Sequence, residues 1–135
     1  WGVSYATSPQ GADHTAGAVG EDPLSPYGQA NRSRYSQISM AAFDSLGMCW
    51  FTFINGSYDL LLPMINALYG LSWDTRQYLE MGTKMIRMEI AFNRKAGLGP
   101  EQEQMPQWLK QETLPPTNAK FDVPDDDYEK VWKDF

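Results

Sequence analysis

The sequence predicts an all-α protein, an irregular helical domain that begins with a glycine-rich loop. Apolar side chains recur at spacings of three and four residues in several segments, which is the period of an amphipathic helix. Gly47, Gly70 and Gly97 follow three of these segments, and a left-handed glycine commonly ends a helix. No segment alternates apolar and polar residues as a half-buried strand does. A chain of 135 residues suffices for one core, so we expect residues 1–135 to form one domain.

Residues 1–21 are expected to be a loop rather than a helix. They are rich in Gly, Ala, Ser and Thr and sustain neither a helical nor an alternating period. Glycine lets a backbone approach another group closely, because it has no Cβ. We therefore expect this loop to lie against something large.

The first long helix is expected within residues 22–47. Ser25-Pro26 is a favourable opening, because Ser caps a helix and Pro suits its first position. Gly47 is a natural end, which places Cys49 just beyond a helix C-terminus. The apolar run that starts at Cys49 is expected to stop at Asn55-Gly56, a turn pair.

A second helix is expected over residues 60–69, with Pro63 in its first turn. The third, over residues 74–96, has the clearest signals. Asp74 can cap its start, and Gln77 lies three positions later, a variant of the capping box.

Shorter elements are expected after residue 97. The segment "MPQWLKQ" reads as a short helix and "LPPTNAK" as a linker. A last helix is expected over residues 124–135, where the acidic run Asp125–Asp127 suits the first turn of a helix. The chain opens at Trp1 without Met and stops abruptly at Phe135, which suggests a piece cut from a longer protein.

Composition and charge argue against several functional classes. Hydrophobic residues form 42% of the chain, which is too much for a disordered protein. The net charge is −6 and no basic stripe is present, so we expect neither nucleic acid nor a membrane as partner. The single cysteine excludes an internal disulfide and is typical of a reducing compartment, so we expect a cytoplasmic protein.

The residues with the most reactive side chains each allow a plain and a functional interpretation. His14 is either a surface histidine or a proton donor carried by the small-residue loop "QGADHTAG". Cys49 is either a small buried apolar residue or a metal ligand whose partners lie elsewhere, since a zinc or iron–sulfur site needs about four ligands. Glu89 lies on the apolar face of the third helix, where it is either paired with Arg87 or Arg94 or catalytic.

Two stretches of the sequence resemble motifs of a known family and follow each other in the same order as in that family. "YATSPQGADH" and, downstream, "DSLGMC" resemble the "YAT(S/N)xRGxxH" loop and the "DxxGLC" motif of the tungsten-containing aldehyde ferredoxin oxidoreductases. The stretch "INALYGLSWDTRQYLEMGTKMIRMEIAFNRKAG" resembles the helices that follow in that family, and "MPQWL" and "YEKVWKDF" resemble its later segments. The resemblance therefore covers nearly the whole chain and assigns it to the C-terminal part of the family's proteins.

The resemblance implies an enzyme that oxidises aldehydes to carboxylates. In the family, tungsten (molybdenum in some relatives) lies between two pterins beside a 4Fe–4S cluster, and electrons leave to ferredoxin. The expected partners are an aldehyde, ferredoxin and the remaining domains of the same protein, with a homodimer as a further expectation. The chain alone, which has one cysteine, is expected to hold no cofactor and to be inactive.

The same resemblance implies roles for individual residues. His14 would stand beside the metal as a proton donor, and Cys49 would be the one cluster ligand from this part of the chain. Asp44, Gly47 and Met48 would bind a pterin, and residues 1–21 would be a cofactor-facing loop.

The sequence departs from the family pattern near the loop. Gln10 stands where the family has Arg, and Ala16 where one member has Lys, so acidic or phosphorylated substrates are in doubt. Met48 for Leu is a volume-conserving change. Two alternatives remain open: a non-catalytic helical domain for binding or assembly, and a family member that reduces carboxylates or aromatic acyl-thioesters.

Overall fold

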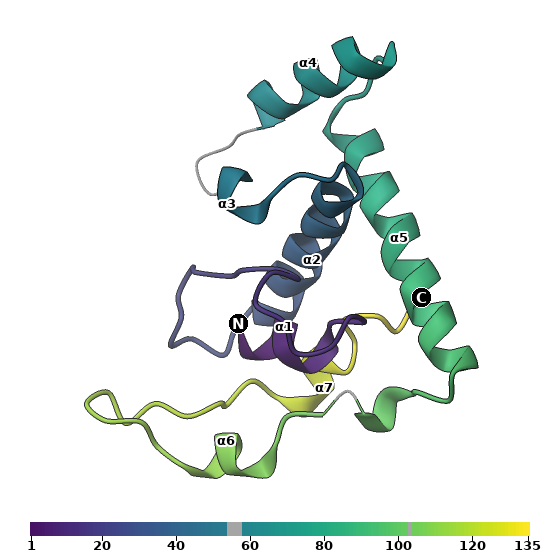
Figure 1. The fold of residues 1–135 in the computed structure, drawn as a ribbon. Helices are drawn as coiled ribbons and strands as arrows, with labels where there is room; N and C mark the ends of the chain where they lie inside the picture. Colours follow the sequence, from purple (N-terminus) through teal and green to yellow (C-terminus); the bar gives the residue numbers. More distant parts are fainter. Residues whose placement is uncertain (54–57, 103) are drawn as a thin grey trace.

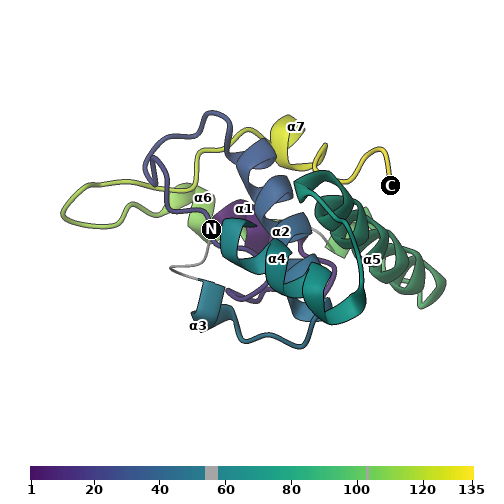
Figure 2. The ribbon, with the colours of Figure 1, turned by 90° about the horizontal axis from the view of Figure 1, so that it is seen from above.

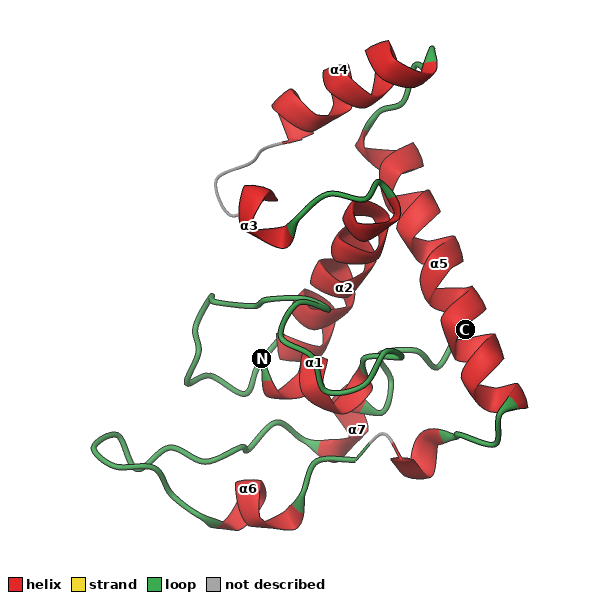
Figure 3. Cartoon of the chain, in the orientation of Figure 1, coloured by secondary structure: helices red, strands yellow, loops and turns green. Residues whose placement is uncertain are grey.

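The structure, a computed structural model, describes residues 1–53, 58–102 and 104–135. Figures 1 and 3 show a helical molecule; within those residues the only β pairing is an isolated antiparallel bridge between Leu114 and Ala119. The all-α prediction is therefore confirmed. The helices are α1 (Gly2–Thr7), α2 (Gln29–Ser45), α3 (Trp50–Phe53), α4 (Tyr58–Tyr69), α5 (Thr75–Lys95), a 3-10 turn (Pro100–Gln102), α6 (Gln107–Gln111) and α7 (Asp125–Tyr128).

The two long helices, α2 and α5, pack directly against each other and form the frame of the domain (Figure 1). Gly82 makes this approach possible, because a Cβ at that position would lie 1.9 Å from the carbonyl oxygen of Ile38 and 3.2 Å from Cβ of Ala42. Nearby, the Tyr78 hydroxyl donates a 2.8 Å hydrogen bond to the carbonyl of Ser39. Gly82 thus sets the spacing of the helices that carry Asp44 and Glu89.

Two apolar clusters lie along α5. One joins the N-terminal half of α5 to α2 and α4, and Figures 1 and 2 show α4 lying across the end of α2. The other joins the C-terminal half of α5 to α1 and to residues 121–135, the C-terminal segment. The buried members are Met40, Ala42, Phe43, Leu61, Ile65 and Tyr78 in the first cluster, and Val3, Ile86, Ile90, Val123, Tyr128, Val131 and Trp132 in the second.

The expectation that residues 1–21 are entirely loop is wrong, because Gly2–Thr7 forms α1. Contacts with the rest of the protein stabilise this six-residue helix. Val3 is buried in the second cluster, and the hydroxyls of Ser4 and Ser33 are hydrogen-bonded at 2.7 Å. Such contacts outweigh weak local propensity in a helix this short.

The expected last helix over residues 124–135 is also much shorter than predicted, because α7 ends at Tyr128. The residues that follow form successive turns with backbone bonds from Val131 to Tyr128 and from Phe135 to Trp132. Trp132 is buried, and its indole Nε1–H donates to the carbonyl of Thr7 at 2.7 Å. The burial of this ring and its hydrogen bond to α1 determine the path of the chain after Tyr128, so the helix does not continue.

The other boundaries differ from expectation by a few residues, and one is confirmed in detail. Helix α2 begins at Gln29 instead of near Ser25, because Gly28 before it is left-handed with φ of 73°. Helix α4 begins at Tyr58, so Pro63 lies inside it. The capping box at the start of α5 is present as predicted.

The segment from residue 107 to 111 is helical as predicted. The predicted turn at Asn55-Gly56 lies outside the described residues. Among those that are described, no helix is long and apolar enough to cross a bilayer.

Candidate functional site

The loop after α1 is held against both long helices. The side-chain amide of Asn93 donates a 2.6 Å hydrogen bond to the carbonyl of Pro9, and Ser36 Oγ donates to the carbonyl of Ala18 at 2.9 Å. Gly17 lies so close to α2 that a Cβ there would be 2.9 Å from the backbone nitrogen of Gln37. The glycines and small residues of this stretch therefore permit close packing, as the sequence suggested.

His14 lies on the outer side of this loop, with 62% of its side chain exposed. Its Nδ1 is 3.5 Å from Oδ1 of Asp13, and its ring meets the ring of Trp50 edge to face at a centroid distance of 6.4 Å. Trp50 directly follows Cys49 in the chain. The fold therefore brings the His14 loop and the Cys49 segment together.

Asp13 is the anchor of the His14 loop, and sequence reasoning missed it. Its carboxylate accepts hydrogen bonds from Thr15 Oγ1 at 2.6 Å, from Thr15 N at 2.9 Å and from Gln10 Nε2 at 3.0 Å. These bonds, those of Thr15 foremost, lower the pKa of Asp13 and keep it ionised. The spacing Asp-x-Thr, typical of a side-chain-capped turn, is the sequence signal that was available.

Cys49 follows the end of α2, where Gly47 adopts φ of 69° and its N–H bonds to the carbonyl of Asp44 at 2.9 Å. The thiol is free and exposed, so the interpretation of Cys49 as a buried apolar residue is wrong. Met48, by contrast, is partly buried against the first apolar cluster. Within the described residues no group of three or more His, Cys, Asp or Glu side chains could hold a metal ion.

Asp44 and Glu89 line one small cavity of about 230 Å³ between α2 and α5. Burial raises the pKa of Asp44, and the nearby Asp13 carboxylate raises it further. Burial likewise raises the pKa of Glu89, with Asp44 as the second cause. A group that donates hydrogen bonds to these carboxyl groups would therefore be stabilised in the cavity.

The expected ion pair between Glu89 and an arginine is absent from the described part of the chain. Arg94 Nη1 donates to the carbonyl of Phe135 at 3.0 Å, and the Arg87 guanidinium lies 4.6 Å from the centre of the Phe135 ring. Both arginines are thus engaged by the C-terminal segment, which the sequence pattern could not indicate.

Two further polar atoms at the cavity lack partners among the described residues. The amide oxygen of Gln37 is fully buried and unpaired, while its Nε2 donates to Thr7 Oγ1 and Ser33 Oγ at 3.0 Å each. The hydroxyl of Ser8 is buried and unpaired as well, and both residues line the cavity with Asp44 and Glu89. A buried acceptor without a donor is costly, so this cavity suits a ligand edge that carries N–H groups.

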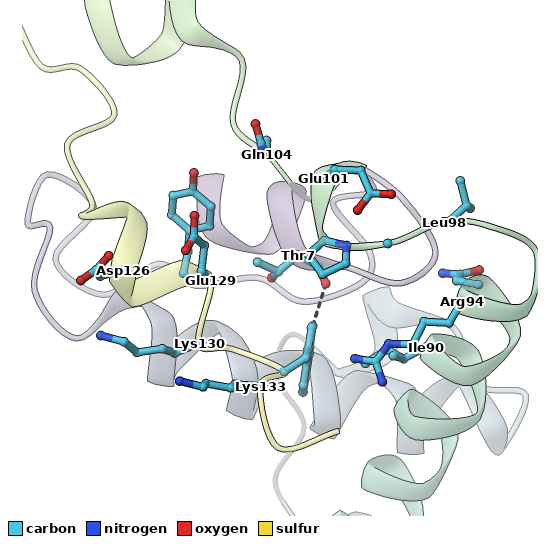
Figure 4. A pocket seen from close by; sticks show the side chains of 15 residues that line it. Thr7, Ile90, Arg94, Leu98, Glu101, Gln104, Asp126, Glu129, Lys130 and Lys133 are labelled. Atoms are coloured by element: carbon cyan, nitrogen blue, oxygen red, sulfur yellow. Dashed lines mark hydrogen bonds between the residues drawn. The ribbon is translucent and has the colours of Figure 1, made fainter.

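A separate hollow of about 760 Å³ lies between the end of α5, the segment after it and the C-terminal segment (Figure 4). None of the predicted site residues lines it. Its walls carry charges of both signs, from Arg94, Glu101, Asp126, Glu129, Lys130 and Lys133.

The family model described as aldehyde ferredoxin oxidoreductase, domains 2 and 3, matches residues 1–135. The chain belongs to the aldehyde ferredoxin oxidoreductase family. This confirms the resemblance drawn from the "GADH" loop and the "DSLGMC" motif.

Curated relatives of the family carry the name tungsten-containing aldehyde ferredoxin oxidoreductase. The one from Pyrococcus abyssi is 36% identical over 76 residues, which are 56% of this chain and 12% of that protein. Those from Pyrococcus horikoshii and Pyrococcus furiosus are 37% and 34% identical over 75 and 76 residues, or 11% and 13% of their lengths. The chain thus corresponds to a small part of these relatives. No solved structure matches it.

Proposed function

We propose that this chain is the part of a tungsten-dependent aldehyde oxidoreductase that closes one side of the cofactor site, as a segment of a longer polypeptide. The observation that carries the proposal is the contact between His14 and Trp50, which joins the "GADH" loop to the cysteine motif. Membership of the aldehyde ferredoxin oxidoreductase family supplies the reaction class.

The residues at the site fit the implied cofactors. Cys49 offers an exposed thiol directly after the turn at Gly47, as a ligand to a cluster completed by residues outside this chain would require. Asp44, together with the unpaired amide oxygen of Gln37, offers acceptors for the N–H groups of a pterin edge. Met48 would contribute its backbone, since its side chain packs into the apolar cluster.

In the proposed reaction an aldehyde and water give a carboxylic acid, two protons and two electrons. When bound, the tungsten–pterin centre and the cluster would supply the oxidation chemistry and the route by which electrons reach ferredoxin. His14 would hold a proton at the substrate oxygen. Asp13, kept ionised by Thr15, lies 3.5 Å from Nδ1 of His14 and would orient the imidazole.

The test uses the full-length protein that contains this chain. His14→Ala should retain tungsten and iron but lower kcat by roughly 10² to 10⁴, the range for a lost general acid or base. Cys49→Ser should lose the cluster's absorbance and redox signal, because an alkoxide replaces thiolate poorly at iron. Met48→Leu, adjacent and volume-conserving, is the matched control and should be normal in both measurements.

Different outcomes point to the alternatives. A full-length protein that binds no tungsten and oxidises no aldehyde would instead support a binding or assembly domain. Reduction of carboxylates or aromatic acyl-thioesters without aldehyde oxidation would retain the cofactors and change the reaction. Unchanged turnover in His14→Ala would overturn the role of that residue.

A further inference from the structure

Glu89 lies where two cavities meet. The inner one is the cavity of about 230 Å³ between α2 and α5 described above. The outer one is a hollow of about 300 Å³ along α5, bordered by Met88 and Phe92, and it opens to solvent because these residues are 64% and 71% exposed. Three residues belong to the walls of both cavities: Pro9, Gln10 and Glu89.

Of these three shared residues, only Glu89 carries an acid–base group. The side chain of proline has none, and the Gln10 amide does not titrate and already donates to Asp13 Oδ2 at 3.0 Å. The Glu89 carboxyl forms no hydrogen bond or ion pair with a described residue, since Arg87 and Arg94 are engaged by the C-terminal segment. It is therefore available to exchange a proton with groups in either cavity.

The inner cavity is polar enough to hold a short chain of water molecules. The amide oxygen of Gln37 and the hydroxyl of Ser8 are buried at its wall without a partner among the described residues. The Gln37 amide is fixed in orientation, because its Nε2 donates to Thr7 and Ser33 at 3.0 Å each. A water molecule takes up about 30 Å³ and needs at least two polar partners, so this cavity has room and partners for several.

The surroundings of Glu89 favour a proton on its carboxyl group. Burial raises the pKa of Glu89, and the Asp44 carboxylate of α2 raises it further. The pKa of Asp44 is itself raised by burial and then by Asp13 of the loop after α1. Within the described residues no cation pairs with Glu89 or Asp44. A raised pKa brings a carboxyl group nearer to neutral pH, where it can both take up and release a proton.

We propose that Glu89 is the proton-exit residue of the enzyme, taking up protons from water in the inner cavity and releasing them to water in the outer hollow. The inference rests on the proposed function, in which aldehyde oxidation releases protons and Asp44 contacts the cofactor at the inner cavity. In each transfer an O–H bond forms on the Glu89 carboxylate while one breaks in a protonated water. The carboxyl then gives this proton to water outside and regains its charge. The electrons leave separately towards ferredoxin, so Glu89 undergoes no redox change.

The experiment compares Glu89→Gln with wild type in the full-length holoenzyme, using propanal and benzaldehyde as substrates and benzyl viologen as electron acceptor. Glutamine keeps the shape of the side chain but cannot carry the proton, so kcat at low buffer concentration should fall by at least about 10-fold with KM little changed. Glu80→Gln is the matched control and should behave like wild type. Glu80 lies on the same helix, but it is exposed and pairs with Arg76 at 3.3 Å.

Two further readouts separate proton exit from a structural role. Imidazole buffer should restore much of the kcat of Glu89→Gln, because a small diffusing base can replace the missing carboxyl, whereas it cannot repair a distorted site. Infrared difference spectra of the full-length protein between acidic and neutral pH, recorded without substrate, give a readout independent of turnover. A protonated-carboxyl band that titrates above the ordinary glutamate range should be present in wild type and Glu80→Gln and absent from Glu89→Gln.

The outcomes separate this proposal from the proposed function. A Glu89→Gln enzyme as fast as Glu80→Gln, or a loss that imidazole does not relieve, would overturn the role of Glu89 while leaving aldehyde oxidation intact. Glu89→Asp keeps a carboxyl group and should retain more activity than Glu89→Gln; equal losses in the two variants would also contradict proton exit. A wild-type holoenzyme that oxidises neither aldehyde would overturn the proposed function itself, and proton exit with it.

Discussion

Replacing Gly82 by Ala should force α2 and α5 apart. The new methyl group would sit 1.9 Å from the Ile38 carbonyl oxygen and 2.9 Å from the carbonyl carbon, far inside the 3.4 Å of ordinary contact. Both are backbone atoms, so no side-chain rotation can relieve the overlap. The helices must therefore move apart.

The magnitude follows from two opposing terms. Overpacking of this kind costs about 1–3 kcal/mol and occasionally more. Alanine recovers about 1 kcal/mol of helix propensity relative to glycine. Because the overlap is severe and involves backbone, we expect a net loss near 2 kcal/mol in the free energy of unfolding.

The assay is urea denaturation of the 135-residue chain followed by circular dichroism, with Gly20→Ala as control. Gly20 has open space around its Cβ position, so the same chemical change should leave stability within about 0.5 kcal/mol or raise it slightly. A Gly82→Ala chain as stable as wild type, beside a Gly20→Ala chain that behaves as stated, would refute the close helix approach.

Three further predictions concern stability. The pKa values of Asp44 and Glu89 are higher in the folded state than in the unfolded state, so their contribution to stability is fully present below pH about 4 and is lost as pH rises through the folded values. In the double variant Asp44→Asn with Glu89→Gln, the urea denaturation midpoint should change less between pH 4 and 7 than it does in wild type. Trp132→Phe leaves the Thr7 carbonyl without its indole donor and should cost about 1–3 kcal/mol in the same urea assay; a neutral effect would contradict the anchoring of the C-terminal segment. Asp74→Ala removes the α5 cap and should cost about 0.5–2 kcal/mol, whereas Asp74→Asn should recover most of it.

Local sequence determined the parts of this protein whose signals lie within a few residues. Asp74 and Gln77 predicted the start of α5, because a capping box involves only neighbouring backbone and side-chain groups. Gly47 and Gly97 marked helix ends, where only glycine adopts positive φ without strain. The "GADH" and "DSLGMC" stretches, read in order, indicated the family. Each of these conclusions required no knowledge of how distant segments meet.

Tertiary structure decided everything that depends on contacts between distant segments. Helix α1 forms and α7 stops early because Trp132 anchors on Thr7, a contact between the two ends of the chain. Arg87 and Arg94 contact Phe135, and Glu89 lines one cavity with Asp44 in place of the expected ion pair with an arginine. Such pairings depend on the free energy of packing the whole core, to which residues near in sequence contribute only a part, so no local pattern could indicate them.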